Sequence, residues 1–408
     1  MKKNRKLKII LLLIITNLIT LGISNVLLIK TENRVVVPVA DYNKLTSVYE
    51  KYSKVEYVEN IITNEYYKKP DTSKFRDGQL KGLVASLQDP YSAYLTQEEY
   101  KMMNEDTAGK FGGIGVIVTP GEDNLITVVS PIVGTPGEKA GIKPEDKIIR
   151  VNGEEFLGEE MNKAVKVMKG EPGTEVELTI MRKNSKGLNE VFDLKIKREL
   201  IKVESVKSDV IEDKIGYIAI TSFDELTHKD FVKELNKLEN EKQVEGLIID
   251  LRNNPGGLLD VCADIADELL GEADIVYTED RHGKRQYLKS KKGHTELPLV
   301  LLVNEGSASA SEILSGAIKD NNRGKIVGKQ TFGKGLVQTI MKLPDNSGLK
   351  FTISEYYTPN GINIHGVGLE PDYIVDLPED IKGIGLDFIN KDTQLQKALE
   401  VLKEEMNK

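Results

Sequence analysis

Residues 298–314, with the sequence PLVLLVNEGSASASEIL, join an apolar run to the start of an amphipathic pattern. The first six residues predict a buried strand, and the apolar residues at the end have the spacing of a helix. The turn between them carries the hydroxyl groups of Ser307, Ser309 and Ser311. Unpaired backbone N–H groups at a helix start carry partial positive charge, so they can stabilise an oxyanion beside a serine. The alternative is that these serines only cap the helix, so the choice depends on whether the chain also supplies a base.

A second junction of this kind lies earlier in the chain. Residues 246–252 are almost continuously apolar, which is typical of a strand buried on both faces. The loop 253–257, NNPGG, leads from this run into a helical pattern over residues 258–270. The repeated alternation predicts a mixed α/β layer around a central sheet. Since ligand sites in such sheets gather at the carboxyl ends of the strands, the loop and the serine turn are expected to share one cleft.

Two residues are candidates for the base. His365 lies in a glycine-flanked stretch and would complete a histidine triad with a serine. Lys334 lies in TFGKGLVQ, residues 331–338, between glycines that allow the backbone to approach closely. A lysine acts as a base only when burial lowers its pKa from about 10.4, and the apolar neighbours could supply that burial. In an extended strand Lys334 and Gln338 point to the same face, so Gln338 is expected to orient the amine.

The N-terminus has the pattern of a membrane anchor. Five basic residues precede an almost uncharged run over residues 9–29, which is close to the length that spans a bilayer as a helix. No convincing small-x-small cleavage site precedes Lys30, which favours an uncleaved signal anchor over a signal peptide. By the positive-inside rule, the residues from about Lys30 onward are expected outside the cytoplasm.

The composition excludes several classes of function. The net charge is −8, and without the five N-terminal basic residues it is −13, which argues against nucleic acid as a partner. Cys262 is the single cysteine, so no intrachain disulfide can form. The four histidines and the cysteine form no metal-binding motif, so neither a metal nor another cofactor is expected.

Two further segments separate the N-terminus from the α/β part. Apolar residues at helical spacing over residues 42–65 and 79–87 predict a helical N-terminal region. The sequence then becomes glycine-rich, with FGGIGVIV at residues 111–118. A glycine-rich loop that runs into a strand leaves amides free for a terminal carboxylate and a strand edge free for an extended peptide. The alternative is an ordinary glycine turn.

The order of elements that follows resembles a circularly permuted PDZ domain of the bacterial protease type. Strands and short helices are predicted in turn over residues 109–198. The resemblance implies that Gly113, Ile114, Gly115 and Val116 form the carboxylate-binding loop. It also implies that a helix over residues 162–168 forms the other wall of the peptide groove.

Several stretches together make the chain resemble the C-terminal processing peptidases, or tail-specific proteases. They are residues 87–95 (LQDPYSAYL), 111–118, 250–257, 307–313, 333–338, and 361–368 with 371–372. Members of this family are PDZ-containing serine peptidases with a Ser/Lys catalytic pair. The resemblance implies that Ser309 is the nucleophile, Lys334 the general base and Gln338 the residue that orients Lys334.

The resemblance also distinguishes among the remaining candidates. It implies two oxyanion donors, one at the amide of Ala310 and the other at either Gly256 or Gly257. It makes Ser307 and Ser311 packing or capping residues. The histidine candidate receives no role in proton transfer.

The expected fold class is α/β multidomain, with a membrane anchor, a helical N-terminal region, a PDZ domain and an α/β peptidase core around a central sheet. The predicted boundaries follow the changes in composition along the chain. They are residues 1–30 for the anchor, 31–108 for the helical region, 109–198 for the PDZ domain, 199–378 for the Ser/Lys peptidase core and 379–408 for a C-terminal helical tail.

The expected function is that of a serine endopeptidase in a bacterial cell envelope. The enzyme would bind the C-terminal tails of exported or membrane-associated proteins through the PDZ domain and cleave peptide bonds through an acyl-enzyme. Its role would be processing, quality control or a proteolytic signalling cascade. The alternatives are a membrane-anchored PDZ scaffold with an inactive peptidase domain and a hydrolase that uses His365. The helices at both ends could also form a homodimer interface.

Overall fold

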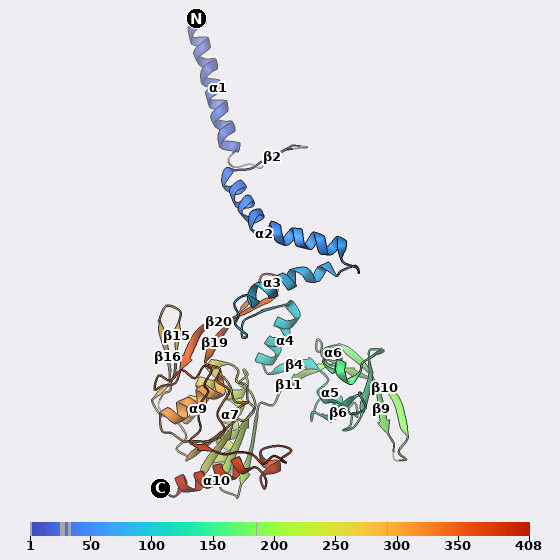
Figure 1. The fold of residues 1–408 in the computed structure, drawn as a ribbon, viewed down its shortest axis with the longest axis vertical. Coiled ribbons are helices and arrows are strands. Elements are labelled where there is room, and N and C mark those ends of the chain that lie inside the picture. Colours follow the sequence, from blue (N-terminus) through green and yellow to red (C-terminus); the bar gives the residue numbers. More distant parts are fainter. Residues whose placement is uncertain (1, 25–28, 32–33, 185, 292) are drawn as a thin grey trace. The chain divides into compact units, whose positions relative to one another are not determined.

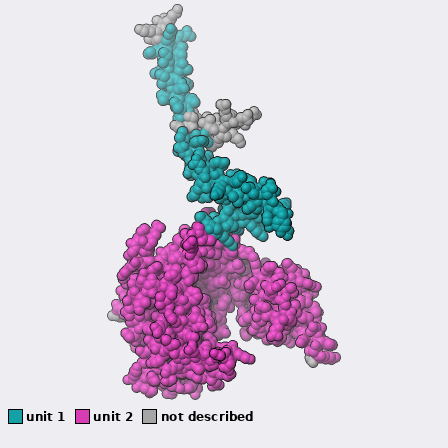
Figure 2. Space-filling view, in the orientation of Figure 1, with its two compact units in different colours: residues 1–83 teal, residues 84–408 magenta. Residues whose placement is uncertain are grey.

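The computed structural model describes residues 2–24, 29–31, 34–184, 186–291 and 293–408 (Figure 1). Contacts between residues divide the chain into two compact units, Met1–Leu83 and Val84–Lys408 (Figure 2). All of the predicted site residues belong to the second unit. The finer division into five parts stays a prediction.

The first unit consists mainly of helices. Its elements are α1 (Lys2–Ser24), the antiparallel pair β1 (Ile29–Thr31) and β2 (Arg34–Val36), α2 (Val39–Glu65), the 3-10 turn η1 (Thr72–Lys74) and most of α3 (Phe75–Ala85). The predicted helical region over residues 42–65 coincides with α2. None of the residues of α2 is buried, so its large apolar side chains face solvent.

The predicted anchor coincides in part with α1. Apolar side chains along this helix, including Leu11, Leu12 and Leu18, are exposed. Residues 25–28 of the predicted apolar run lie outside the described residues. In the part of the chain that the structure describes, no helix combines the length and the apolar character needed to cross a membrane.

In the second unit, the glycine-rich segment opens an antiparallel sheet with the strand order β10-β9-β7-β6-β5. The strands are β5 (Val116–Pro120), β6 (Ile126–Pro131), β7 (Lys147–Val151) with its partner β8 (Glu154–Glu155), β9 (Glu175–Lys183) and β10 (Asn189–Lys197). Helix α5 (Pro136–Lys139) follows β6, and the 3-10 turn η2 (Gly158–Glu160) leads into α6 (Met161–Met168). Because β5 is the edge strand and α6 contacts it, the free edge of the sheet lies beside a helix.

Short elements join this sheet to the rest of the second unit. They are β3 (Ala93–Leu95), α4 (Gln97–Thr107), β4 (Lys110–Gly113) and β11 (Glu199–Lys202). The predicted capping box at the start of α4 is present, since the N–H of Thr96 donates to Glu99 over 2.8 Å and the N–H of Glu99 donates to Thr96 over 3.3 Å. Strands β4 and β11 pair antiparallel. The chain therefore enters and leaves the part that contains the sheet β10-β9-β7-β6-β5 through one pair of strands.

The central sheet has the strand order β12-β13-β14-β17-β18-β21, and only β12 runs antiparallel to its neighbour. The strands are β12 (Val206–Ile211), β13 (Ile215–Ile220), β14 (Gly246–Asp250), β17 (Leu299–Val303), β18 (Lys325–Gly328) and β21 (Tyr373–Ile374). Every residue of β14 and β17 is buried, as their continuous apolar sequence predicts.

Helices cover both faces of the central sheet. They are α7 (Thr227–Asn236) with its π-helical extension η3 (Lys237–Glu241), α8 (Leu259–Leu269), α9 (Ala310–Asp320) and α10 (Thr393–Met406). Alternate strand residues such as Leu247 and Leu301 pack with α7, α8 and α9. The residues between them, such as Ile248 and Val300, pack with α10. The predicted α/β layer is therefore present, and both strand-to-helix junctions leave the same sheet.

A second, antiparallel sheet carries the segment with Lys334 at its edge. Its strands are β16 (Arg285–Lys289), β15 (Asp274–Asp280), β20 (Gly348–Tyr357) and β19 (Leu336–Lys342), in that order. Strand β3 from the first part of the unit also pairs with β20. The sheet thus brings residues near position 90 beside residues near position 350.

The C-terminal helix corrects one expectation. Its apolar stripe, with Leu395 and Leu402, is buried against the central sheet, so this stripe is not available for a homodimer interface. The short 3-10 turn η4 (Leu386–Phe388) precedes the helix. The fully buried Arg252 side chain fastens the helix start, because it lies 2.6 Å from Asp250 and 2.8 Å from the N-cap carboxylate of Asp392. An amphipathic pattern cannot distinguish a partner chain from the chain's own sheet, which explains the difference.

Candidate active site

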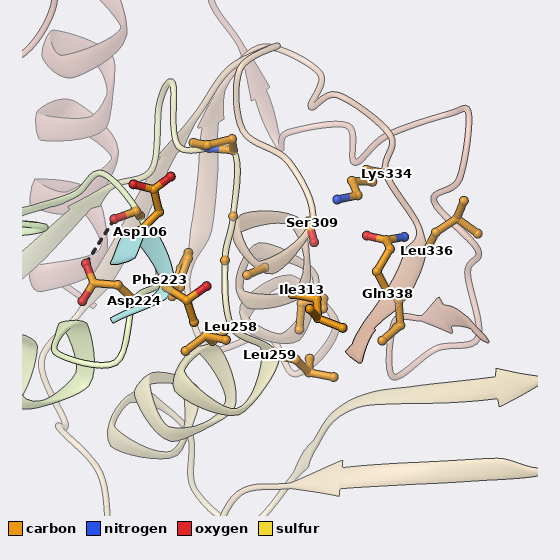
Figure 3. A pocket seen from close by; sticks show the side chains of 18 of the residues that line it. Asp106, Phe223, Asp224, Leu258, Leu259, Ser309, Ile313, Lys334, Leu336 and Gln338 are labelled. Atoms are coloured by element: carbon orange, nitrogen blue, oxygen red, sulfur yellow. Dashed lines mark hydrogen bonds between the residues drawn. The ribbon is translucent and has the colours of Figure 1, made fainter. Parts of the chain in front are cut away.

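The two strand-to-helix junctions meet at one cavity of about 380 Å³ (Figure 3). Its lining includes the loop 255–259, the start of α9, and the segment from Lys334 to Ile340. Direct contacts join the two junctions, since the N–H of Asn253 donates to Asn304 over 2.8 Å and Ser307 Oγ donates to the Leu251 carbonyl over 2.8 Å. The expectation of a shared cleft therefore agrees with the arrangement of the chain.

Ser309 occupies an unusual backbone conformation at the N-cap of α9. Its φ is 53° and its ψ is −112°, a combination that a non-glycine residue adopts at a cost of about 1–3 kcal/mol. The turn is held by neighbouring backbone. A Cβ atom on Gly256 would lie 2.7 Å from the carbonyl oxygen of Ala308 and 2.9 Å from Ser309 Cβ, so only glycine allows this approach. The strained turn places the Ser309 side chain in the wall of the cavity (Figure 3).

The backbone amides beside Ser309 differ in their availability. The N–H of Gly256 donates to the side chain of Asn254 over 2.9 Å. Among the described hydrogen bonds, none uses the N–H of Gly257 or of Ala310. Both of these residues line the cavity together with Ser309, so two free N–H donors are available at this site. Of the two glycines in the loop, Gly257 is therefore the one whose N–H group is free to donate.

Lys334 lies partly buried in the same cavity. Burial lowers the pKa of its amine, and the positive charge of Lys350 acts in the same direction. The charges of Asp89 and Glu312 oppose this shift. The Lys334 nitrogen lies over the face of the Tyr91 ring, 5.0 Å from the ring centroid. The pKa shift favours the neutral amine, which is the form that can accept a proton.

The glycines beside Lys334 have the role that the sequence predicted for them. Gly333 has a φ of 89°, and a Cβ atom there would lie 2.9 Å from the nitrogen of Gly368. A Cβ atom on Gly335 would lie 2.7 Å from the nitrogen of His365. The loop 364–368 therefore packs directly on the backbone around Lys334, and the two glycines are needed for that close contact.

Gln338 lines the same cavity as Lys334. Lys334 precedes β19, so alternation along this strand does not by itself set the direction of the Lys334 side chain. The register between β19 and β20 shifts between Val337 and Gln338, as at a β-bulge. The extra residue is Ile353 of β20, so the side chains along β19 keep their alternation. The side chains of Ser309, Lys334 and Gln338 line one cavity (Figure 3), but none of the hydrogen bonds in the described residues links these three side chains.

Glu312, which was not among the residues predicted from the sequence, connects the Ser309 turn to the Lys334 loop through its carboxylate. The side chain is fully buried. Its Oε2 atom accepts hydrogen bonds from the N–H of Ser309 at 2.8 Å and from the N–H of Lys334 at 2.9 Å. Its Oε1 atom accepts from Thr331 Oγ1 at 2.5 Å and from the N–H of Gly333 at 2.7 Å. A glutamate three residues after an N-cap serine is a capping-box signal, which could have identified it.

His365 takes no part in this arrangement. The residue is exposed, and its ring lies edge-on to Tyr91 at a centroid distance of 6.4 Å. It does not line the cavity that holds Ser309. The geometry therefore gives no support to a histidine triad.

Across the described ranges, no three His, Cys, Asp or Glu side chains are grouped as metal ligands.

The predicted carboxylate-binding loop lies between β4 and the edge strand β5. Gly113 ends β4, Val116 begins β5, and Ile114 and Gly115 form the connection. The carbonyls of Ile114 and Gly115 accept hydrogen bonds from Gly137 and Ile132, whereas no hydrogen bond of the described residues uses their N–H groups. Gly115 has a φ of 71°, and a Cβ atom there would clash with Thr135. This loop therefore offers free amides next to the open edge of β5.

Comparisons with known proteins agree with this arrangement. A model described as peptidase family S41 matches residues 214–375, a PDZ domain model matches residues 127–182, and a model described as the activating protease CtpB N-terminal domain matches residues 25–99. A candidate S41 protease from Bacteroides fragilis shares the fold with a TM-score of 0.52 at 16% identity, over 86% of this chain and 97% of that one.

Two relatives are more similar in sequence. A carboxy-terminal-processing protease of Bartonella bacilliformis is 40% identical over 349 residues, which are 84% of this chain and 79% of the relative. The carboxy-terminal processing protease CtpA of Bacillus subtilis is 40% identical over 331 residues, which are 81% of this chain and 70% of the relative. The chain therefore belongs to peptidase family S41, among the PDZ-containing carboxy-terminal processing proteases of the serine type.

Proposed function

We propose that this chain is an endopeptidase in which Ser309 is the nucleophile, Lys334 the general base and Gln338 the residue that orients the base. The observation that carries the proposal is a partly buried lysine with a lowered pKa in the same cavity as a serine on a strained strand-to-helix turn. A neutral lysine can activate a serine in place of histidine. The match to family S41 supports the same reaction.

The proposed reaction begins when Lys334 takes the proton of the Ser309 hydroxyl. Ser309 Oγ attacks the peptide carbonyl, and the oxyanion that forms accepts hydrogen bonds from the amides of Ala310 and Gly257. The choice of Gly257 rests on the hydrogen bond that already uses the amide of Gly256. Lys334 then donates its proton to the leaving amine. Water activated by the same lysine releases the acyl group from Ser309.

The pH dependence of cleavage tests the role of Lys334. Protonated Lys334 cannot act as base, so kcat/KM is expected to rise with pH through a midpoint clearly below about 10.4, the pKa of a solvated lysine. Replacing Lys350 with glutamine removes a positive charge that lowers this pKa, so the midpoint is expected to move to higher pH. The measurement is the rate of cleavage of an unstructured peptide between pH 6 and 11. A midpoint that equals the solvated value would count against Lys334 as base.

We further propose that the PDZ domain binds the free C-terminal tail of a substrate. The free amides of Ile114 and Gly115 could hold the terminal carboxylate, and the edge of β5 could pair with the extended tail. Since Ser309, Lys334 and Gln338 share no hydrogen bond in the described conformation, binding of the tail could also favour their alignment. The PDZ domain would then gate access to the reaction.

Blocking the substrate tail tests the gate. A peptide with an amidated C-terminus is expected to be cleaved about tenfold more slowly than the same peptide with a free carboxylate, because the carboxylate contact is lost. Acylation of Ser309 by a small active-site reagent in the absence of peptide serves as the control, because it shows that both assays use the same amount of active enzyme. Equal cleavage rates for the two peptides would contradict recognition of the tail.

The location of the enzyme is part of the proposal. Five basic residues lie at the start of a helix with exposed apolar side chains, as in a signal anchor that leaves the catalytic part outside the cytoplasm. The substrates would then be exported or membrane-associated proteins.

The alternative of a PDZ scaffold with an inactive peptidase domain predicts that a Ser309→Ala variant behaves like the wild type.

A further inference from the structure

The segment Asp89-Pro90-Tyr91-Ser92, here called loop 89–92, precedes the PDZ domain in sequence but contacts the second sheet near Gln338. The strand that follows it, β3, pairs antiparallel with β20, and Ala93 lies opposite Lys350. Its sequence lies within the part of the chain that matches the CtpB N-terminal domain, whereas the site residues lie within the match to family S41. Residues from outside the peptidase match thus reach the proposed catalytic residues.

A chain of hydrogen bonds leads from loop 89–92 to Gln338. The Gln338 amide nitrogen donates to Thr352 Oγ1 over 3.3 Å, and the same hydroxyl donates to Asp89 Oδ2 over 2.6 Å. Because each hydroxyl has one proton, its donation to Asp89 leaves Thr352 Oγ1 as an acceptor for Gln338. The amide nitrogen of Gln338 therefore faces Thr352, and its oxygen is left as the acceptor for the amine of Lys334.

Loop 89–92 is itself firmly held on β20. Ser92 Oγ donates to Asp89 Oδ2 over 2.6 Å and accepts from the N–H of Thr352 over 3.1 Å. The N–H of Tyr91 donates to Asp89 Oδ1 over 2.9 Å. Although burial opposes it, these hydrogen bonds from Ser92 and Thr352 keep the pKa of Asp89 below its usual value. The acceptor at the end of the chain therefore stays charged at neutral pH.

The same loop covers the proposed base. The Tyr91 ring faces the amine of Lys334 at 5.0 Å. Movement of loop 89–92 would therefore change two things together: the rotamer of Gln338 and the solvent exposure of Lys334. The alternative is that the loop only fastens β3 to the sheet and stabilises the fold without an effect on the reaction.

We propose that loop 89–92 and Thr352 position Gln338, and through it Lys334, so that the segment before the PDZ domain completes the active site. The inference rests on the proposed function, because it assumes that Gln338 orients Lys334. Asp89 and Thr352 are positioning residues in this scheme and do not touch the substrate. Hydrogen-bonded side chains of this kind determine how accurately a reacting group is held.

The test uses the full-length protein and a Thr352→Val substitution, which keeps the β-branched shape and removes the hydroxyl. It is expected to lower kcat about tenfold without a change in KM, because the amide of Gln338 loses its partner. Thr352→Ser restores a hydroxyl and is expected to retain most of the activity. The matched control is Thr339→Val on the adjacent strand, since the Thr339 side chain makes no hydrogen bond among the described contacts, and wild-type kcat is expected.

A double-mutant cycle separates positioning from general stability. In a Gln338→Ala background, Thr352→Val is expected to cause no further loss of kcat, because the residue through which it acts is already absent. Ser92→Ala provides a second route to the same loop and is expected to lower kcat by a smaller factor. Melting temperatures of all variants are measured in parallel, so kcat is compared only among folded proteins.

The outcomes are distinct. Wild-type kcat in both Thr352→Val and Ser92→Ala, with Ser309→Ala inactive, would overturn the inference and leave the proposed function intact. An equal tenfold loss from Thr352→Val with and without Gln338 would also overturn it, because Thr352 would then act independently of Gln338. Cleavage by the Ser309→Ala variant would overturn the proposed function and, with it, the inference.

Discussion

Replacing Ser309 with alanine is expected to abolish peptide cleavage, with kcat lowered by at least about 10,000-fold. The substitution removes the only atom proposed to form the acyl bond, and the oxyanion donors and the base cannot replace it. The fold is expected to persist, because the backbone contacts of the turn are kept. The N–H of residue 309 still donates to Glu312, and the neighbouring N–H of Ala308 still donates to Asn254. The measurement is the cleavage rate of an unstructured peptide with a free C-terminus.

Ser315→Ala is the matched control for that experiment. Ser315 is fully buried on the same helix, and its hydroxyl donates to the carbonyl of Ser311 within that helix. Its loss is expected to leave kcat near the wild-type value. If Ser309→Ala cleaved the peptide as fast as Ser315→Ala, Ser309 would have no place in the mechanism, and the scaffold alternative would gain support.

Replacing Glu312 with glutamine is expected to give the second large effect, a loss of both activity and stability. The carboxylate accepts four hydrogen bonds from the turn of Ser309 and the loop of Lys334. Glutamine turns one of the two accepting atoms into an NH₂ donor, which then faces donors in a buried site. Leaving such groups unpaired costs about 3 kcal/mol of unfolding free energy. Since the same atoms hold the nucleophile and base loops together, kcat is expected to fall about 100-fold.

Thermal unfolding and peptide cleavage measure these two losses separately. Glu305→Gln is the matched control, because Glu305 lies in the same turn but is exposed. It is expected to change neither the melting temperature nor kcat. A Glu312→Gln variant with wild-type stability and kcat would show that the four hydrogen bonds do not position the two loops.

The strand-to-helix junctions could be predicted closely from the sequence. The apolar run at 298–303 contains β17 (Leu299–Val303), and the helical pattern at 258–270 contains α8 (Leu259–Leu269). Such patterns depend on neighbouring residues alone, since burial on both faces gives a continuous apolar run and a helix gives a period of 3.6. The family could also be identified from short motifs, and the comparisons confirm it.

Predictions that depended on which surfaces meet were less successful. The apolar stripe with Leu395 and Leu402 was a candidate for a homodimer interface, yet it packs on the central sheet of its own chain. Lys334 and Gln338 line one cavity, but Lys334 precedes β19, so the alternation of this strand does not by itself orient both side chains. The bulge opposite Gln338, at Ile353 of β20, depends on the pairing of two strands, so the pattern of one strand does not reveal it.

The sequence by itself determined that this chain has a buried α/β sheet, a serine turn at a helix start and a lysine between two glycines. Only the tertiary structure decided how these parts form a site. The strained φ of Ser309 is maintained by contact with Gly256, and the carboxylate of Glu312 reaches the N–H of Lys334, 22 residues away. The hydrogen bond from Thr352 to Asp89 joins residues 263 positions apart. Local patterns record which residues become buried or helical, but hydrogen bonds across such distances depend on how the finished sheets bring their loops together.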